Sequence, residues 1–313
     1  MGNNVSHDIT VNPRSVIVIS TLSIAYLVLS YFLVGFKGDQ VVLLLLANGL
    51  FYASKVTRKF FIAYLTFLVY WVIFDYMKAF PNYRYNTVHM ADLYNFEKHL
   101  FGIHFNGILL TPNEYLKLNS TSFLDVTSGI FYLCWIPVPF GFGIYLFITN
   151  RRQCLEFLIA FVVVNLVGFV IYYAYPAAPP WYIQDHGYTL ITNTGENVAG
   201  LIRFDNYFHA RIFQSIYTKG SNVFAAMPSL HSAYPIVVFY YAAKNRLYKA
   251  SVVFGIVTVG IWFGAVYTSH HYVLDVLAGI ACAIAGISLF NLLMHKWGWF
   301  GRFVDRYESL IKK

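Results

Sequence analysis

The sequence predicts an all-α protein, a polytopic bundle of transmembrane helices with about eight spans. Three observations predict this fold. Of the 313 residues, 58% are hydrophobic and only 12% are charged, whereas about a quarter of the residues in a soluble domain are charged. The apolar residues gather in repeated runs, most of them near the ~20 residues that cross a bilayer as a helix. Basic residues cluster in alternate connections between these runs, as the positive-inside rule describes.

Apolar runs give the expected spans in order along the chain. They are 15–36, 40–54, 60–80, 125–149, 154–175, 229–243, 250–268 and 271–294. The second run is short, so it is expected to tilt less or to lie partly at the membrane interface. Two long connections, 81–124 and 176–228, separate the runs. Because no soluble domain, repeat or low-complexity tract is visible, we expect one membrane-embedded catalytic domain over residues 1–313.

The basic residues orient the predicted bundle. They form four segments: Lys55, Arg58 and Lys59; Arg151 and Arg152; Lys244, Arg246 and Lys249; and Lys296, Arg302, Arg306, Lys312 and Lys313. If each run crosses once, all four segments lie in the cytoplasm, with both termini, and the long connections lie on the other side. Six crossings, with the first two runs re-entrant, is the alternative, and it leaves the later spans unchanged.

The net charge of +8 is explained by this topology. No basic tract interleaved with aromatic residues indicates nucleic-acid binding. The three cysteines, Cys134, Cys154 and Cys282, lie within or beside apolar runs and show no CxxC spacing. The sequence therefore indicates neither a disulfide framework nor a cysteine metal site.

Two short segments carry the candidate chemistry, Met227–His231 and Ser269–Asp275. Each opens an apolar run on the non-cytoplasmic side, and Ser229 and Ser269 suit the N-cap position of a helix. The two runs travel in the same direction through the membrane, so their N-termini can converge. We expect each N-terminus to present free backbone N–H groups and a positive dipole end to one anion.

His271 and Asp275 are four residues apart, so on a helix they share one face. A carboxylate inside a membrane is costly unless it is paired, which marks Asp275 as a functional candidate. It is expected to accept a hydrogen bond from one imidazole nitrogen, leaving the other nitrogen free to attack. His231 can then protonate a leaving oxygen. A single interfacial histidine is usually a polar cap, but this cluster favours function. No HExxH or similar ligand spacing occurs, so no metal is expected.

These two segments resemble the second and third signature motifs of the type-2 phosphatidic acid phosphatase superfamily. The usual forms are PSGH, and a Ser-Arg pair followed by HxxxD. Here Leu230 stands in the place of the glycine and Ala265 in the place of the arginine. The first motif of the phosphatases, a lysine with a downstream Arg-Pro pair, is not recognisable. The resemblance implies a six-helix catalytic core of the phosphatase kind.

A longer resemblance points to one branch of this superfamily. The tract Tyr175–Tyr182 (YPAAPPWY), together with Leu201–Asp205 and the PSLH and SHHYVLD segments, resembles the inositol phosphorylceramide synthases. These are the aureobasidin-sensitive enzymes known from fungi, with bacterial relatives. The resemblance covers roughly residues 81–290, and the stretch from Tyr94–Glu97 through Phe101-Gly102 fits it too.

The resemblance implies roles for individual residues. The third-motif histidine, here His271, is the nucleophile and forms a phosphohistidine; the second-motif histidine, here His231, is the acid/base; and Asp275 orients His271. The absent arginine leaves phosphate binding to other groups. Our candidates for substrate binding are Ser229, His270, Arg203, Arg211, Lys219 and Trp181. For each basic residue among them, an ordinary loop charge is the alternative.

The implied reaction is a phosphotransfer that moves inositol phosphate from phosphatidylinositol to the primary hydroxyl of ceramide or dihydroceramide. It requires no cofactor. A phosphatase acting on phosphatidic acid or a polyprenyl diphosphate is the alternative, and a proton-coupled transporter is a third hypothesis that lacks the expected internal symmetry. The site is expected on the non-cytoplasmic face, in the periplasm of a bacterium or in the Golgi lumen of a eukaryote. The sequence does not indicate an oligomeric state.

A transferase must keep water away from its intermediate. The connection 176–228 is apolar enough to cover the site, and interfacial anchoring is the alternative role of its aromatic residues. These residues are Trp181, Tyr182, Tyr188, Phe204, Tyr207 and Phe208.

Overall fold

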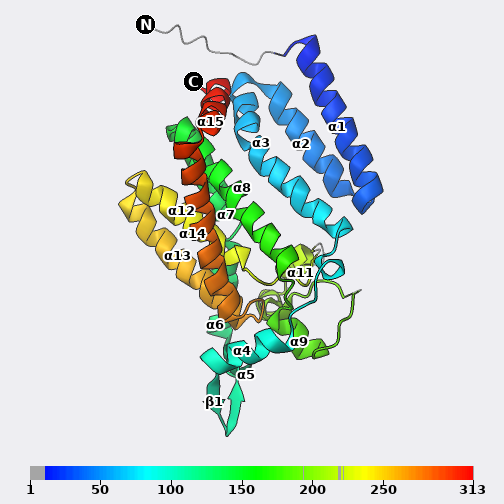
Figure 1. The fold of residues 1–313 in the computed structure, drawn as a ribbon, viewed down its shortest axis with the longest axis vertical. Helices are drawn as coiled ribbons and strands as arrows, with labels where there is room; N and C mark the ends of the chain where they lie inside the picture. Colours follow the sequence, from blue (N-terminus) through cyan, green and yellow to red (C-terminus); the bar gives the residue numbers. More distant parts are fainter. Residues whose placement is uncertain (1–10, 193, 218–219, 221, 313) are drawn as a thin grey trace. The chain divides into compact units, whose positions relative to one another are not determined.

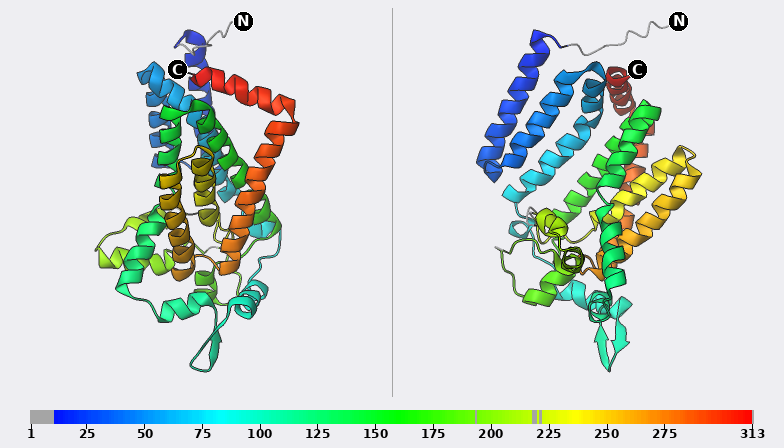
Figure 2. Two further views of the ribbon diagram at one scale, coloured as in Figure 1. Left: turned by 90° about the vertical axis from the view of Figure 1, so that its left-hand side faces the viewer. Right: turned by 180° about the vertical axis from the view of Figure 1, so that it is seen from behind.

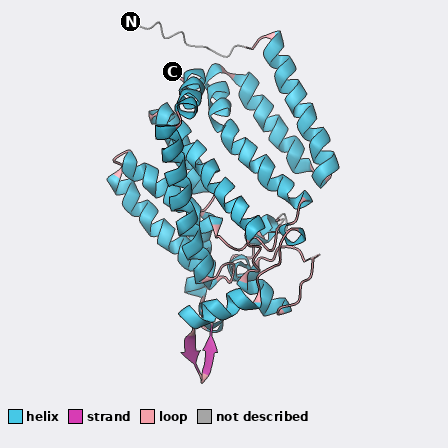
Figure 3. Ribbon diagram, in the orientation of Figure 1, coloured by secondary structure: helices cyan, strands magenta, loops and turns pink. Residues whose placement is uncertain are grey.

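The structure is a computed structural model that describes residues 11–192, 194–217, 220 and 222–312. It is almost entirely helical (Figures 1 and 3), which confirms the all-α class. Each predicted apolar run coincides with helix. By length and mean hydropathy, six helical segments of the described residues are suited to cross a membrane. They are Pro13–Val34, Lys55–Ala79, Ser122–Thr149, Arg151–Ala174, Tyr248–Tyr267 and Val273–Lys296. The chain is therefore an integral, multi-pass membrane protein.

Two predicted spans are short helices. Helix α2 (Gly38–Ala53) has 16 residues and α12 (Leu230–Lys244) has 15. At 1.5 Å per residue, each is about 22–24 Å long, less than the ~30 Å hydrocarbon core of a bilayer. The number of crossings and their orientation therefore stay predictions.

The fourth predicted run, 125–149, is interrupted in the structure. It contains two helices, α6 (Ser122–Leu133) and α7 (Pro137–Thr149), separated by a turn. Proline has no backbone N–H, so Pro137 cannot donate to the carbonyl of Leu133, where the first helix ends, and proline is well tolerated in the first turn of the second helix. The segment as a whole, Ser122–Thr149, is still long and apolar enough to cross a membrane.

The described chain forms two compact units. The first contains residues up to Phe80, Gly143–Val162 and the segment from Leu289. Its complete elements are α1 (Pro13–Val34), α2, α3 (Lys55–Tyr76), η1 (Met77–Ala79) and α15 (Gly298–Ile311). The views in Figures 1 and 2 show α1, α2 and α3 side by side. A single catalytic domain over 1–313 stays a prediction.

Polar contacts tie the helices of the first unit together. Ser30 on α1 and Tyr76 on α3 share a hydrogen bond of 2.9 Å between their hydroxyl oxygens. The guanidinium of Arg152 pairs with Asp305 at 2.5 Å and with Glu308 at 3.1 Å, both on α15. Such contacts let polar side chains lie among apolar helices, because each polar group has a partner.

The second unit spans Pro81–Phe142 and Val163–Ser288 and holds both histidine segments. Helices α7, α8 (Arg151–Ala174) and α14 (Val273–Lys296) run through the boundaries between the units. The remaining elements of the second unit are η2 (Asn82–Arg84), α4 (Ala91–Phe101), β1 (Ile103–Phe105), β2 (Ile108–Leu110), α5 (Pro112–Leu118), α6, α9 (Pro180–His186), η3 (Ala199–Leu201), α10 (Ile202–Tyr207), α11 (Ile212–Tyr217), α12 and α13 (Tyr248–Tyr267).

The long connections are built from short helices and one hairpin. Strands β1 and β2 pair antiparallel with Ile103 opposite Leu110. Asn106 and Gly107, both with positive φ, form the turn, as an Asn-Gly pair commonly does in two-residue hairpins.

A buried apolar cluster, here called the Tyr132 cluster, lies between α6, α10, α11, α13 and α14. Its members are Tyr132, Leu201, Phe204, Phe213, Tyr217, Ala265, Val266 and Val276. Glycine permits the close approach of α6 and α13, because a Cβ at Gly260 would lie 2.3 Å from the ring of Phe131. Helix α12 packs along α13 (Figures 1 and 2).

The aromatic residues of the 176–228 connection divide into two groups. Trp181, Tyr182 and Phe204 are buried in apolar clusters, so they contribute to the core of the unit. Tyr188, Tyr207 and Phe208 are about half exposed. The cover over the site stays a prediction.

Candidate active site

The N-termini of α12 and α14 meet, as the sequence predicts. The amide of Ser229, the N-cap of α12, donates to the carbonyl oxygen of Asp275 at 2.9 Å. One turn further along α14, a Cβ at Gly279 would lie only 2.2 Å from the carbonyl oxygen of Ser229. Glycine is therefore required here for the two helix ends to come together, and with them the two histidine segments.

The imidazoles of His231 and His271 are in contact. Nδ1 of His231 lies 3.1 Å from Nε2 of His271 and 3.1 Å from the hydroxyl of Tyr132. Nδ1 of His271 lies 3.0 Å from the carbonyl oxygen of Ala226. Since a carbonyl can only accept, Nδ1 of His271 carries the proton and Nε2 carries the lone pair that faces His231. This is the tautomer that a nucleophilic imidazole needs.

His271 lies in the loop before α14, and 6% of its surface is exposed. Burial lowers the pKa of its imidazole to about 4, so the ring is neutral at neutral pH and its lone pair is available. His231 is partly exposed, with the indole of Trp135 packed edge-on against it at 4.5 Å between centroids.

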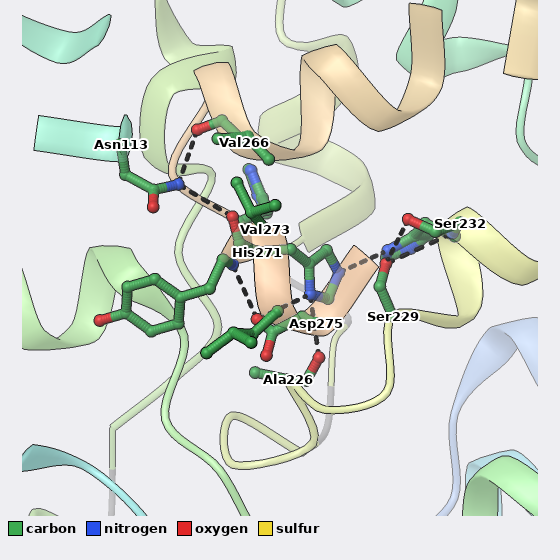
Figure 4. A network of polar contacts seen from close by, with 12 residues as sticks. Asn113, Ala226, Ser229, Ser232, Val266, His271, Val273 and Asp275 are labelled. Atoms are coloured by element: carbon green, nitrogen blue, oxygen red, sulfur yellow. Dashed lines mark hydrogen bonds and ion pairs between the residues drawn. The ribbon is translucent and has the colours of Figure 1, made fainter. Parts of the chain in front are cut away.

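Asp275 is close to His271 but does not take the expected hydrogen bond. The distance from its Oδ2 to Nδ1 of His271 is 3.6 Å, too long for a hydrogen bond. Oδ2 accepts instead from the amide of Tyr272 at 2.8 Å, because α14 begins at Val273 and Asp275 caps its first turn (Figure 4). The Ala226 carbonyl orients the ring, and the buried carboxyl group of Asp275 lies beside it.

The N-terminus of α14 is not open to an anion, which corrects the sequence prediction. The carboxylate of Glu97, on α4, accepts the amide of Val273 at 2.9 Å and that of Leu274 at 3.1 Å. Glu97 is fully buried, and burial raises its pKa to about 7 while the two amides act in the opposite direction. Sequence reasoning did not assign Glu97 a role; its place in the Tyr94–Glu97 stretch was the one available signal.

The two serines have different roles. Ser229 caps α12 as predicted, because its hydroxyl accepts the amide of Ser232 at 3.3 Å. Ser269 is not an N-cap. It lies in the turn after α13 with φ of 61°, and its hydroxyl accepts from the Gln184 side chain at 3.1 Å.

Backbone pairing fixes the carbonyl that orients His271. Ala226 donates to the carbonyl of Ala177 at 3.2 Å, and Ala178 donates to the carbonyl of His89 at 3.0 Å. The Tyr175–Tyr182 tract therefore holds Ala226 in place, which gives this sequence feature a structural purpose. The side-chain amide Nδ2 of Asn113 donates to the backbone carbonyls of His271 and Val266, both at 2.8 Å (Figure 4).

The remaining substrate-binding candidates mostly have other partners. Arg203 is paired with Asp125 at 2.5 Å, and Arg211 is exposed ahead of α11. Trp181 is buried, and its amide donates to Ser269. Lys219 lies outside the described residues. His270 is different, because it is buried beside the two catalytic candidates, with ring contacts to Tyr132 and Tyr217.

Both departures from the phosphatase motifs have local structural partners. Leu230 is buried and packs on Gly168 of α8, where a Cβ would lie 2.7 Å from the leucine side chain. Ala265 is fully buried in the Tyr132 cluster. Leu230, which is larger than the glycine of the phosphatase motif, packs against a glycine. Ala265, which is smaller than the arginine of that motif, packs against aromatic rings.

Comparisons with known proteins agree with the geometry. Residues 108–289 match the PAP2 superfamily, named for the type-2 phosphatidic acid phosphatases. The chain is 44% identical over 301 residues to a phosphoinositol dihydroceramide synthase of Bacteroides thetaiotaomicron, covering 95% of this chain and 97% of that protein.

Fungal relatives are more distant. The catalytic subunit of inositol phosphorylceramide synthase from Saccharomyces cerevisiae is 27% identical over 240 residues, which are 74% of this chain and 56% of that protein. The inositol phosphorylceramide synthase of Candida albicans is 26% identical over 263 residues, which are 81% of this chain and 52% of that protein. No solved structure matches the chain significantly.

Proposed function

The chain belongs to the PAP2 superfamily, and from this premise we propose that it is a phosphoinositol dihydroceramide synthase. It moves inositol phosphate from phosphatidylinositol to the primary hydroxyl of ceramide or dihydroceramide. The observation that carries the proposal is the 44% identity to such a synthase over nearly the whole length of both proteins. The paired imidazoles of His231 and His271, 3.1 Å apart, support the same chemistry.

The first half of the reaction is attack on the donor lipid. The Nε2 lone pair of His271 attacks the phosphorus of phosphatidylinositol, and the bond from phosphorus to the diacylglycerol oxygen breaks. His231, in its imidazolium form, gives its Nδ1 proton to that oxygen as the general acid and becomes the neutral imidazole. Diacylglycerol leaves, and inositol phosphate stays on His271. The two imidazoles are in direct contact in the structure, so they must part to admit the phosphate.

The second half returns the enzyme to its starting state. His231, now the base, accepts the proton of the ceramide primary hydroxyl, and the oxygen attacks phosphorus. The bond from phosphorus to Nε2 breaks, which restores the neutral imidazole of His271. The phosphorylated imidazole carries a positive charge, and the buried carboxylate of Asp275, 3.6 Å from Nδ1, is placed to stabilise it.

Acceptor dependence tests the proposal. Purified protein is given phosphatidylinositol labelled in the inositol ring, with dihydroceramide, without it, or with a 1-O-methyl dihydroceramide that lacks the acceptor hydroxyl. We expect rapid release of diacylglycerol only in the mixture that contains dihydroceramide, and in that mixture the label should appear in the sphingolipid. Equally rapid release in all three mixtures, with free inositol phosphate as product, would make water the acceptor and the protein a phosphatase.

We also propose that the site faces away from the cytoplasm. The alternating basic segments support this placement, which suits lipid substrates whose chains stay in the bilayer while their headgroups reach α12 and α14 at the membrane boundary.

A further inference from the structure

We propose that Tyr217 and His270 recognise the donor headgroup, with the Tyr217 hydroxyl binding a phosphate oxygen and the His270 imidazole binding a hydroxyl of the inositol ring. This inference rests on the proposed function and assigns residues to its donor specificity. It also accounts for the place of the arginine that the phosphatase motif has and this chain lacks.

Position 265 is the starting point. Ala265 is fully buried in the Tyr132 cluster, which includes Tyr132 and Tyr217. Its carbonyl accepts the amides of His270 at 3.1 Å and His271 at 3.0 Å. A side chain longer than alanine would extend from the same backbone that holds both histidines. In this chain the aromatic residues of the Tyr132 cluster occupy the space that a longer side chain at position 265 would enter. Their polar atoms therefore take the place of the arginine guanidinium of the phosphatase motif.

These rings are contiguous with the catalytic pair. Tyr132 lies 5.3 Å from His231 and 5.5 Å from His270, between ring centroids. Tyr217 lies 4.6 Å from His270. Burial, and then the neighbouring imidazoles of His271 and His231, lower the pKa of His270 well below its usual value. The three imidazoles are therefore close enough to act on one substrate.

Two polar atoms in this group are buried and unsatisfied. The Tyr217 hydroxyl and Nε2 of His270 have no hydrogen-bond partner of good geometry within the described residues. The nearest polar groups are the Tyr132 hydroxyl beside Tyr217 and the Asn197 backbone beside the His270 ring. Buried polar atoms are nearly always paired, so an unpaired one needs a reason. Two of them on rings in contact, next to the catalytic pair, indicate a ligand that brings their partners.

Their protonation states define that ligand. Burial, and then the adjacent hydroxyl of Tyr132, raise the pKa of Tyr217 well above its usual value, so the phenol keeps its proton and donates. Thr268 donates its hydroxyl proton to the Gly264 carbonyl at 2.7 Å, so its oxygen accepts from Nδ1 of His270 at 3.0 Å. Nε2 of the neutral His270 ring is then an acceptor.

One donor beside one acceptor fits a phosphate ester of a polyol. A phosphate oxygen accepts from Tyr217, and an adjacent ring hydroxyl donates to His270. A choline headgroup has no hydroxyl, so it leaves the His270 nitrogen unsatisfied, which disfavours its binding. The pair therefore selects inositol-type headgroups as well as holding their phosphate.

The test separates the two roles with three variants at the two positions and with two probes. Tyr217→Phe removes the hydroxyl and keeps the ring; His270→Leu removes the acceptor, and His270→Asn retains an acceptor oxygen. Orthovanadate, a phosphate analogue without a polyol, probes the first contact, and the KM for phosphatidylinositol probes both. Tyr307→Phe is the matched control, because it removes a hydroxyl that donates to the Ile62 carbonyl in the other unit.

We expect Tyr217→Phe to weaken both vanadate inhibition and phosphatidylinositol binding about tenfold or more, as for a hydrogen bond to a charged group. His270→Leu should raise the KM for phosphatidylinositol severalfold, leave vanadate inhibition unchanged and be partly rescued by His270→Asn. Unchanged vanadate inhibition in folded Tyr217→Phe, or equal loss with both probes in His270→Leu, would overturn the proposal. If the wild type released inositol phosphate to water, the proposed transferase would fail, while the vanadate comparison would still decide the role of Tyr217.

Discussion

Gly279 offers a direct test of how closely the two catalytic helix ends must approach. In Gly279→Ala the added Cβ would lie 2.2 Å from the carbonyl oxygen of Ser229 and 3.1 Å from its carbon. Ordinary contact between a carbon and another heavy atom is about 3.5 Å, so one helix end must retreat by about 1 Å. The obstructing atoms belong to the backbone, which cannot rotate away as a side chain would.

The expected effect is on catalysis more than on folding. The retreat lengthens the 2.9 Å bond from the Ser229 amide to the Asp275 carbonyl and displaces His231 from His271. A misplacement of about 1 Å costs on the order of 10²-fold in rate. Overpacking costs about 1–3 kcal/mol in stability, partly offset by the ~1 kcal/mol that alanine gains over glycine within a helix.

The assay is the initial rate of acceptor-dependent transfer, with thermal unfolding in detergent as the check on folding. Gly141→Ala is the matched control, because nothing lies within 4 Å of a Cβ at that position in α7. It should transfer at the wild-type rate. If folded Gly279→Ala also transferred at the wild-type rate, the close approach of Ser229 to α14 would not govern catalysis.

Three further predictions concern the charge beside His271, the cap on α14 and the topology. Asp275→Asn should fold and lose about 10²–10³-fold in turnover, as for loss of a positioned electrostatic group. This loss is smaller than the ~10⁴-fold effect of a wrong tautomer in a serine-protease triad, because Ala226 still fixes the ring of His271. A rate near wild type would remove Asp275 from the reaction. Glu97→Ala leaves two buried backbone amides unpaired, at about 1–3 kcal/mol each. The free energy of unfolding, measured with denaturant, should therefore fall by about 2–6 kcal/mol and recover in part in Glu97→Gln. Wild-type stability of Glu97→Ala would show that water satisfies those amides. In a background without Cys134, Cys154 and Cys282, a cysteine at Asn119 should react with an impermeant reagent from outside and one at Asn245 should not; the reverse pattern would invert the proposed orientation.

Hydropathy was sufficient to predict where the apolar helices lie, and six of them are long enough to suit a membrane. Every predicted run is helical because an apolar run of this length satisfies its backbone only as a helix in lipid. The break at Pro137 shows the limit of that reasoning, since a local backbone preference interrupts a run of uniform hydropathy. The short helices α4, α5 and α9–α11 were not predicted, because they are held by tertiary packing and lack a long apolar stripe.

The candidate site was predictable as a set of residues but not as a set of contacts. The motif spacing identified His231, His271 and Asp275, and the parallel direction of their runs predicted that the helix ends meet. The partners of these groups come from segments distant in sequence: Ala226 orients His271, and Glu97 caps α14. Spacing within one helix predicted a hydrogen bond from His271 to Asp275, yet the helix begins after His271, so the carboxylate caps Tyr272 instead.

Trapping the covalent intermediate tests the central claim most directly. The enzyme is mixed with phosphatidylinositol labelled in its phosphate and with no acceptor, quenched in alkali and digested for peptide mapping. We expect label on His271, a matching amount of diacylglycerol, and transfer of the label to sphingolipid when dihydroceramide is added before the quench. Label on His231, or sphingolipid product formed with no labelled enzyme at any time, would contradict it.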